Sequence, residues 1–165
     1  ELASKLRMLR VHGGAKMYHH DIVGTNSRLD ALQAAVLSAK LPHLASWSGA
    51  RQKNAALYDD MLEDVAEVIT PIVTDDNEHV YNQYTVRARR RDGLSAYLSE
   101  RSIGSGIYYP VPLHLQPYYR REGQADLPGA VAYYRRALTL PLFPAMADAD
   151  VTRVVDALAT ALRPG

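Results

Sequence analysis

The sequence predicts an α/β domain of the α+β type: a small sheet packed with helices and preceded by a long buried helix. Segments with the alternation of strands are interspersed with segments of helical periodicity in the second half of the chain. The first third contains a segment that is apolar nearly all round, which is typical of a helix buried on several sides. The 165 residues are 47% hydrophobic and 22% charged, as in ordinary globular proteins.

The first 62 residues predict three helices and one loop. The opening segment has leucines on one helical face, and a glycine-rich loop follows over residues 13–27. Ser27 precedes Asp30 by three residues, which fits a helix-capping signal and predicts a helix that starts at Arg28. Pro42 should break or kink this helix. We therefore expect helices over residues 1–11, 28–41 and 43–62.

The rest of the chain predicts four strands and three helices. Residues 80–88 alternate, with Tyr84 and Val86 on one face and Thr85 and Arg87 on the other. Pro128 can begin a helix, and the last helix has the clearest apolar periodicity. We expect strands over residues 65–70, 80–88, 105–109 and 139–142. The expected helices cover residues 92–101, 128–138 and 148–162, and residues 118–127 are expected to be exposed.

Composition excludes several classes of function. The formal net charge of +1 gives no electrostatic reason to expect nucleic-acid or membrane binding. The chain has no cysteine, which excludes disulfides, cysteine-bound zinc and thiol catalysis. No signal-peptide pattern is present, so a cytoplasmic protein is expected. The first residue is Glu1, so we also expect that the true N-terminus is missing.

The segment from Gly24 to Arg28 is a candidate anion site. At the start of a helix, free backbone N–H groups and the helix dipole favour a negatively charged group. Asn26 offers amide donors, and the planar guanidinium of Arg28 suits phosphate or carboxylate. An ordinary capped helix with a solvated arginine would show the same pattern, because capping signals are common.

The loop over residues 107–117 is the second candidate site. Its three prolines lower the entropy cost of ordering the loop, while Tyr108, Tyr109 and His114 provide polar groups for a hydroxyl-rich ligand. A purely structural loop with tyrosines stacked on prolines is equally compatible with the sequence. The neighbouring His19 and His20 do not predict a metal site, because adjacent residues rarely bind one ion together.

Five stretches in order along nearly the whole chain carry a family resemblance: ELASKLRMLRVHG, YHHDIVGTNSRLDALQAAVLSAKL, HVYNQYTVR, IGSGIYYPVPLHLQPYY and ALTLPLFPAM. Together they resemble the DegT/DnrJ/EryC1/StrS family of sugar aminotransferases, which use pyridoxal 5'-phosphate. The resemblance implies the C-terminal part of a fold-type-I aminotransferase that forms a homodimer with shared active sites. Residues 1–27 would then be the end of the large cofactor-binding domain. Residues 28–165 would be the small C-terminal domain with its linking helices.

The resemblance also implies roles for individual residues. Asn26 would bind the phosphate of the cofactor in the neighbouring subunit. Arg28 would bind the amino-donor carboxylate or the substrate. Tyr108, Tyr109 and His114 would lie beside the sugar nucleotide, although Tyr108 replaces a histidine often found there.

The family's Schiff-base lysine lies upstream of the segment that matches Glu1, and none of the four lysines of this chain has its sequence context. No catalytic residue is therefore assigned, and the chain alone is expected to be inactive. The resemblance implies that the parent protein moves an amino group, with glutamate the expected donor, to a nucleotide-linked keto sugar for polysaccharide or secondary-metabolite synthesis. Two alternatives stay open: a sugar dehydratase on the same fold, and a non-catalytic fragment for dimerisation or regulation.

Overall fold

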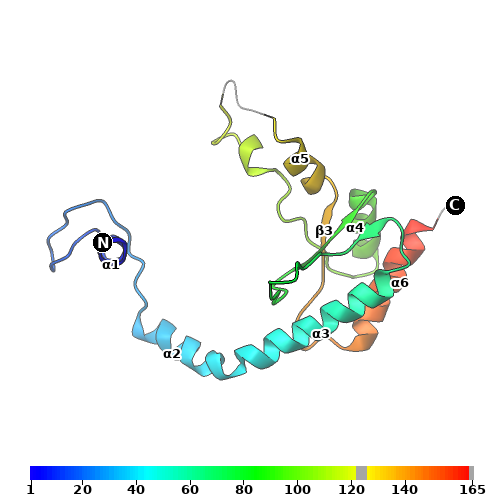
Figure 1. Ribbon diagram of the computed structural model, residues 1–165, viewed down its shortest axis with the longest axis horizontal. Coiled ribbons are helices and arrows are strands. Elements are labelled where there is room, and N and C mark those ends of the chain that lie inside the picture. The colour runs from blue at the N-terminus through cyan, green and yellow to red at the C-terminus, as the bar shows by residue number, and fades with distance from the viewer. Residues whose placement is uncertain (122–125, 164–165) are drawn as a thin grey trace. The chain divides into compact units, whose positions relative to one another are not determined.

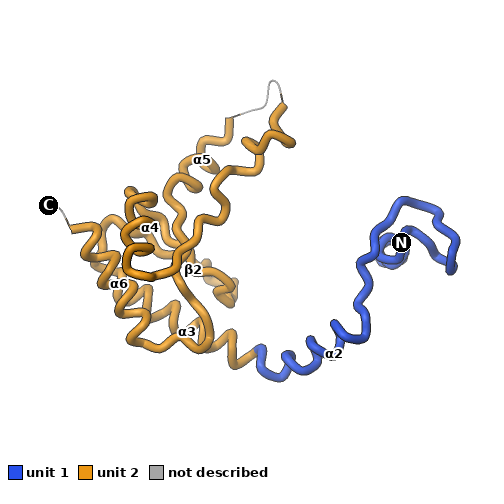
Figure 2. Tube along the Cα trace, turned by 180° about the vertical axis from the view of Figure 1, so that it is seen from behind, with its two compact units in different colours: residues 1–44 blue, residues 45–165 orange. Residues whose placement is uncertain are grey.

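A computed structural model describes residues 1–121 and 126–163 of the chain. These residues form two compact units, residues 1–44 and residues 45–165 (Figure 2). The first unit contains the expected domain tail, residues 1–27, together with the helix that follows it. No helix in the described part of the chain is both long and apolar enough to span a membrane.

The first unit consists of two helices separated by a long loop. Helix α1 covers Leu2–Leu9 and helix α2 covers Ala31–Lys40. The loop between them is closed by an antiparallel bridge between Val11 and Asn26. A 3₁₀ turn, η1, covers Leu41–His43 and includes Pro42, which is where the sequence predicts an interruption.

Helix α2 begins three residues later than the sequence predicts, and its N-cap is Asp30 instead of Ser27. The prediction of the cap was wrong because the backbone of Ser27 is already engaged. Its N–H donates to the carbonyl of Arg10 at 2.8 Å, so Ser27 is part of the extended bridge. The backbone N–H of Asp30 donates to Oε1 of Gln33 at 3.0 Å, which satisfies a polar group at the helix start.

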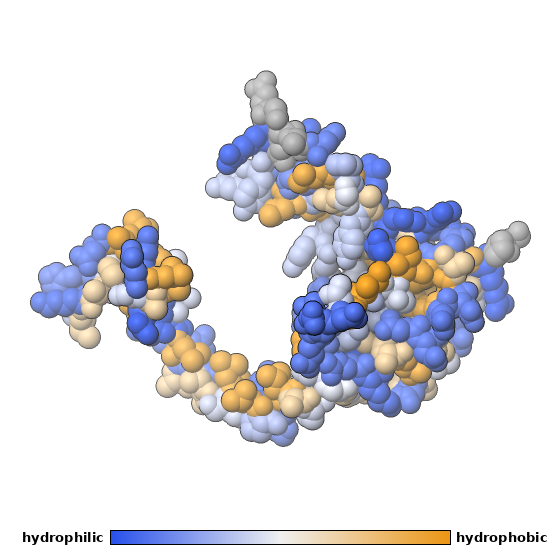
Figure 3. All heavy atoms as spheres, in the orientation of Figure 1, coloured by the Kyte–Doolittle hydropathy of each residue, from blue (hydrophilic) through white to orange (hydrophobic). Residues whose placement is uncertain are grey.

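Helix α2 is exposed within this chain, although its apolar circumference predicts a partner that buries it. Every residue of α2 except the half-buried Ala34 is exposed. Figure 3 shows hydrophobic residues gathered over this helix. The apolar circumference was identified correctly, but none of the described residues covers it.

The second unit is a three-stranded antiparallel sheet with helices packed on one face (Figure 1). Strands β1, β2 and β3 cover Val68–Ile69, Tyr84–Ala88 and Ala137–Leu140, in that spatial order. The helices are α3 (Leu44–Leu62), α4 (Arg91–Glu100), α5 (Pro128–Tyr134) and α6 (Asp148–Leu162), with a 3₁₀ turn η2 at Leu113–Leu115. Residues 148–162 form the last helix as expected.

The core of this unit lies between the sheet and α3, α4 and α6. The alternation predicted for β2 is confirmed: Tyr84, Val86 and Ala88 are buried, whereas Thr85 and Arg87 are half-buried on the other face. Apolar residues at helical spacing meet the buried side of the strand from α3, α4 and α6. The face of β2 opposite α3, α4 and α6 therefore carries polar side chains.

Most strands are shorter than the sequence predicts. The segment 105–109 forms only a bridge between Gly106 and Thr139 at the free edge of β3. Helix α5 ends at Tyr134, and β3 starts at Ala137, two residues earlier than expected. Residues 118–121, 126 and 127 are exposed, as expected, whereas 122–125 lie outside the described residues.

Candidate functional site

The loop of the first unit is held by backbone contacts that side chains would obstruct. The N–H of His12 donates to the carbonyl of Thr25 at 2.9 Å, so the two ends of the loop run side by side. Gly13 has a φ of +81°, and a Cβ atom there would lie 1.7 Å from the carbonyl oxygen of Ile22. A Cβ atom on Gly24 would lie 2.2 Å from the backbone nitrogen of Gly13. Only glycine allows this close approach of the two ends of the loop.

This closure forms a pocket of about 420 Å³ in the first unit. Lys16 and Arg28 provide two permanent positive charges in its lining, and His12 and His20 provide two imidazoles. The remaining lining residues are Val11, Gly14, Ala15, Met17 and Tyr18, so no carboxylate is among them. A pocket with this lining favours an anion.

The ring of His20 is oriented by the backbone of His12. Its Nδ1 lies 3.1 Å from the carbonyl oxygen of His12, and since a carbonyl can only accept, Nδ1 is the donor. The Nε2 atom of His20 is then left for other contacts. The rings of His12 and His20 meet edge to face, with centroids 6.2 Å apart.

The two residues predicted for an anion site lie near each other in this unit. Arg28 lines the pocket, and one of its nitrogens lies 3.1 Å from Oδ1 of Asp30. Both partners of this ion pair are more than half exposed, so it contributes little stability. Asn26 lies in the bridge, and its exposed side chain forms no hydrogen bond with the residues that the structure describes.

The helix-terminus part of the anion-site prediction was wrong. Asn26 and Arg28 precede the first residue of α2 by five and three positions, and the carboxylate of Asp30 occupies the N-cap. Free N–H groups of α2 therefore do not form this site. Its positive character comes from side chains that the loop brings together.

The second unit brings together Tyr109 and His114, two of the three residues predicted in its loop. Both line a groove of about 760 Å³ with Val111, Pro112, Leu113, Tyr119, Arg121, Leu127, Ala130, Tyr133 and Tyr134. Four tyrosines and several aliphatic side chains make this lining mainly apolar with hydroxyl groups at its edges. Such a surface suits a ring that presents both C–H groups and hydroxyls.

Tyr108 does not line this groove. Its ring lies against Gly106, where an added Cβ atom would be 2.5 Å from ring carbon Cε2. Its ring also meets that of Tyr109 at 68°, with centroids 6.0 Å apart. Tyr108 therefore contacts Tyr109 from outside the groove.

Sequence reasoning missed the contributions of His12, Lys16 and His20. From the sequence, His20 is weighed only as a metal ligand and the four lysines only as candidates for the absent catalytic lysine. The available signal was the glycines at the two ends of the loop, Gly13 and Gly14 at one end and Gly24 at the other, which allow the ends to meet. Among the described residues, no group of three or more His, Asp or Glu side chains could hold a metal ion.

Comparisons with known proteins find one family along nearly the whole chain. The model of the DegT/DnrJ/EryC1/StrS aminotransferase family matches residues 1–159. The chain is 45% identical over 163 residues to a pleiotropic regulatory protein of Geobacillus stearothermophilus. It is 42% identical over 160 residues to dTDP-3-amino-3,4,6-trideoxy-alpha-D-glucose transaminase of Streptomyces venezuelae. These alignments cover 96% of this chain but 44% and 42% of the two relatives.

A solved structure shows the same fold. The crystal structure of S. venezuelae DesV in complex with a ketimine intermediate superposes with a TM-score of 0.90 at 41% identity. The superposition covers 99% of this chain and 45% of DesV. The chain thus spans less than half the length of the relatives it matches.

Proposed function

The chain belongs to the DegT/DnrJ/EryC1/StrS aminotransferase family, and from this membership we propose that it is the C-terminal part of a sugar-nucleotide aminotransferase. The proposed protein transfers an amino group from glutamate to a nucleotide-linked keto sugar, for a polysaccharide or a secondary metabolite. Its relatives include enzymes named as transaminases of dTDP-linked and UDP-linked sugars. These names support the nucleotide sugar as the class of substrate.

The observation that carries the proposal is the pocket around Arg28. Its two permanent cations, two imidazoles and lack of carboxylates fit a phosphate group. Both the proposed cofactor and the proposed substrate carry phosphate. Asn26 lies two residues before Arg28, with its amide exposed to a partner.

The donor set fits pyridoxal 5'-phosphate, which supplies an electron sink for amino-group transfer when it is bound. In the proposed homodimer, Asn26 holds the cofactor phosphate of the neighbouring subunit through its amide N–H groups. Arg28 orients the carboxylate of the amino donor or the substrate. Asp30 pairs with the guanidinium of Arg28 at 3.1 Å and orients it.

The groove of the second unit is proposed to hold the sugar part of the substrate. Tyr109 and His114 line it, and their hydroxyl and imidazole groups can hydrogen-bond to sugar hydroxyls. Its aromatic side chains can pack on the C–H face of the ring. Tyr108 acts on this groove through its contact with Tyr109.

The chain by itself is not expected to transaminate. In the proposed enzyme the Schiff-base lysine lies outside this chain, and the lysines present have other surroundings. Lys53 pairs with Asp148 at 2.8 Å, Lys16 lines the phosphate pocket, and Lys40 ends α2. We place the protein in the cytoplasm, where nucleotide sugars are made.

The alternatives are less well supported by the relatives. A dehydratase is not among the activities that their names give. The G. stearothermophilus relative is named as a regulator. That name indicates no ligand. The phosphate and sugar of a nucleotide-sugar transaminase, in contrast, fit the linings of the pocket around Arg28 and of the groove in the second unit.

The proposal is tested with Asn26→Ala in the full-length protein. Loss of a charge-assisted hydrogen bond to the phosphate should weaken pyridoxal phosphate binding by about tenfold or more in equilibrium dialysis. Asn77→Ala is the matched control, because the side chain of the exposed Asn77 bonds only to Thr74 among the described residues. Unchanged cofactor affinity in Asn26→Ala would refute the assignment. Absence of amino transfer to any keto-sugar nucleotide by the wild-type protein would refute the function.

A further inference from the structure

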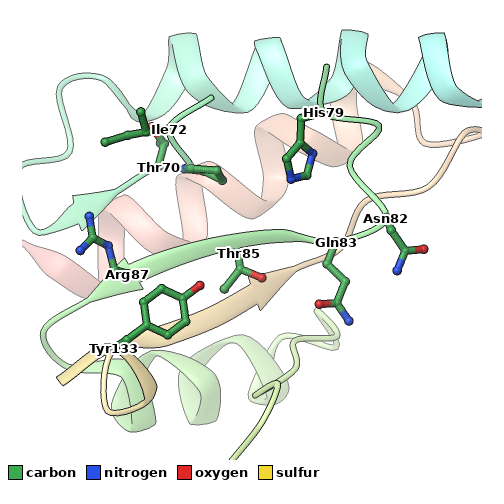
Figure 4. A pocket seen from close by; sticks show the side chains of 9 residues that line it. Thr70, Ile72, His79, Asn82, Gln83, Thr85, Arg87 and Tyr133 are labelled. Atoms are coloured by element: carbon green, nitrogen blue, oxygen red, sulfur yellow. The ribbon is translucent and has the colours of Figure 1, made fainter. Parts of the chain in front are cut away.

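A third pocket lies on the face of the small sheet opposite α3, α4 and α6 (Figure 4). It has a volume of about 490 Å³ and belongs entirely to the second unit. Gln83, Thr85 and Arg87 line it from alternate positions of β2 and the residue before it. Figure 4 shows these side chains in a row, with Arg87 at one end and Gln83 and Asn82 at the other. None of its lining residues belongs to the phosphate pocket around Arg28.

Arg87 differs from Arg90 and Arg91, which follow β2. Arg91 donates to the carbonyls of Tyr134 and Ala137 at 3.1 and 3.3 Å, and Arg90 lies 3.7 Å from Glu67. Arg87 is half-buried and forms no hydrogen bond or ion pair with any described residue. A half-buried guanidinium without a partner loses hydration and gains nothing in return, so the site favours an added anion.

The other polar groups of the pocket can donate hydrogen bonds. The backbone N–H of Tyr81 donates to Nδ1 of His79 at 2.9 Å, which leaves the Nε2–H of the neutral imidazole as a donor. Thr85 shares a hydrogen bond of 2.8 Å with Thr139, and Tyr133 brings a phenol from α5. The two side-chain amides provide both donors and acceptors. The lining contains no Asp or Glu.

The charge count selects the kind of anion. The pocket has one permanent cation, which balances one carboxylate, whereas a phosphate dianion would leave excess negative charge. The planar guanidinium also matches a carboxylate in a two-point contact. We propose that this pocket binds a small polar molecule through its carboxylate, with Arg87 as the charged contact and the row of amides and hydroxyls along β2 as its hydrogen-bonding partners.

The test is a titration of the 165-residue chain with L-glutamate, followed by amide chemical shifts in NMR. Signals of Thr85 and Arg87 should shift and saturate. Arg87→Gln should weaken the affinity by about tenfold or more, since a charge-assisted contact is lost. Arg87→Lys keeps the charge but not the planar group, so its affinity for glutamate should lie between those of the wild type and Arg87→Gln. Arg89→Gln, an exposed arginine outside the pocket lining, should change the affinity by less than about twofold.

Three results would overturn the proposal. The first is no saturable shift with L-glutamate or with acetate. The second is equal binding by wild type and by both Arg87 variants, with circular dichroism showing that all are folded. The third is displacement of glutamate by inorganic phosphate at a lower concentration than by acetate, which would identify a phosphate site instead. This outcome does not bear on the proposed aminotransferase activity. The titration identifies the residues that bind glutamate and does not measure amino transfer.

Discussion

The rings of Tyr58 and Tyr84 stack at the centre of the core, with centroids 4.9 Å apart and an interplanar angle of 22°. Tyr58 comes from α3 and Tyr84 from β2, so the stack joins the longest helix to the central strand. Both side chains are fully buried, and each hydroxyl has a partner. Tyr58 donates to the carbonyl of Pro141 at 2.9 Å, and Tyr84 donates to Oδ1 of Asp59 at 2.5 Å.

This pair predicts a loss of stability at alkaline pH. Burial raises the pKa of both phenols well above 10, and the neighbouring carboxyl groups raise these pKa values further. The unfolded chain releases the same protons near pH 10, so the free energy of unfolding should be level below about pH 10 and fall above it. Each phenol that stays protonated in the fold adds about 1.4 kcal/mol per pH unit to the slope.

Urea unfolding between about pH 8 and pH 11 measures this slope, and Tyr→Phe variants provide its control. Tyr58→Phe should lower stability at neutral pH by about 1 kcal/mol, since a buried carbonyl loses its donor. It should also make the decrease in the free energy of unfolding above about pH 10 shallower, by about 1.4 kcal/mol per pH unit, because one phenol fewer contributes. An unchanged slope in both Tyr58→Phe and Tyr84→Phe would show that the two phenols do not control the alkaline transition.

Asn54 is a second buried polar group whose removal should be costly. Its Nδ2 donates to the carbonyls of Phe143 and Met146 at 3.3 and 3.2 Å, which fixes the segment before α6 against α3. Asn54→Ala should lower the free energy of unfolding by about 1–3 kcal/mol, because two carbonyls lose their donor. Gln52→Ala is the matched control: its bonds to Glu78 and His79 are exposed, so a change below about 0.5 kcal/mol is expected.

Residues 84–88 and 148–162 show which parts of the fold could be predicted from the sequence. Their periodicities reflect burial against this chain's own core. Residues 148–162 form a helix with the expected bounds, whereas the strand expected over residues 80–88 forms only over its second half, Tyr84–Ala88. The edge strands could not be predicted in length. Val68–Ile69 and Gly106 pair with a neighbouring strand over only one or two residues, and that extent depends on tertiary register.

The candidate site was predictable only in part. Arg28 and His114 could be selected from residue type, but the approach of Lys16 and His12 to Arg28 depends on the bridge between Val11 and Asn26. A bridge between residues fifteen positions apart has no local sequence pattern. The apolar circumference of α2 was predictable, but an apolar pattern indicates burial without indicating which partner provides it.

The exposed apolar side chains of α2 predict self-association of the isolated chain. Leu32, Val36 and Leu37 are 79%, 50% and 56% exposed, and Leu41 continues the patch. Such a contiguous surface favours contact with other molecules. Sedimentation velocity should show concentration-dependent oligomers, which Leu37→Lys should reduce. Ser38→Lys adds the same charge to the same helix without removing an apolar side chain. Equal sedimentation of both variants would exclude α2 as the association surface.

Lys16 gives the last prediction, which concerns the pocket of the first unit. Its ammonium group and the guanidinium of Arg28 are the two permanent charges in that lining. Pyrophosphate is a suitable probe, because it carries the phosphate chemistry shared by the proposed cofactor and substrate. Lys16→Gln should weaken pyrophosphate binding by the full-length protein by about tenfold and reduce its dependence on salt. Lys5→Gln is the control: it removes the same charge from α1, outside the pocket lining. Equal losses in the two variants would mean that pyrophosphate responds to overall charge, and the pocket would then not be the binding site.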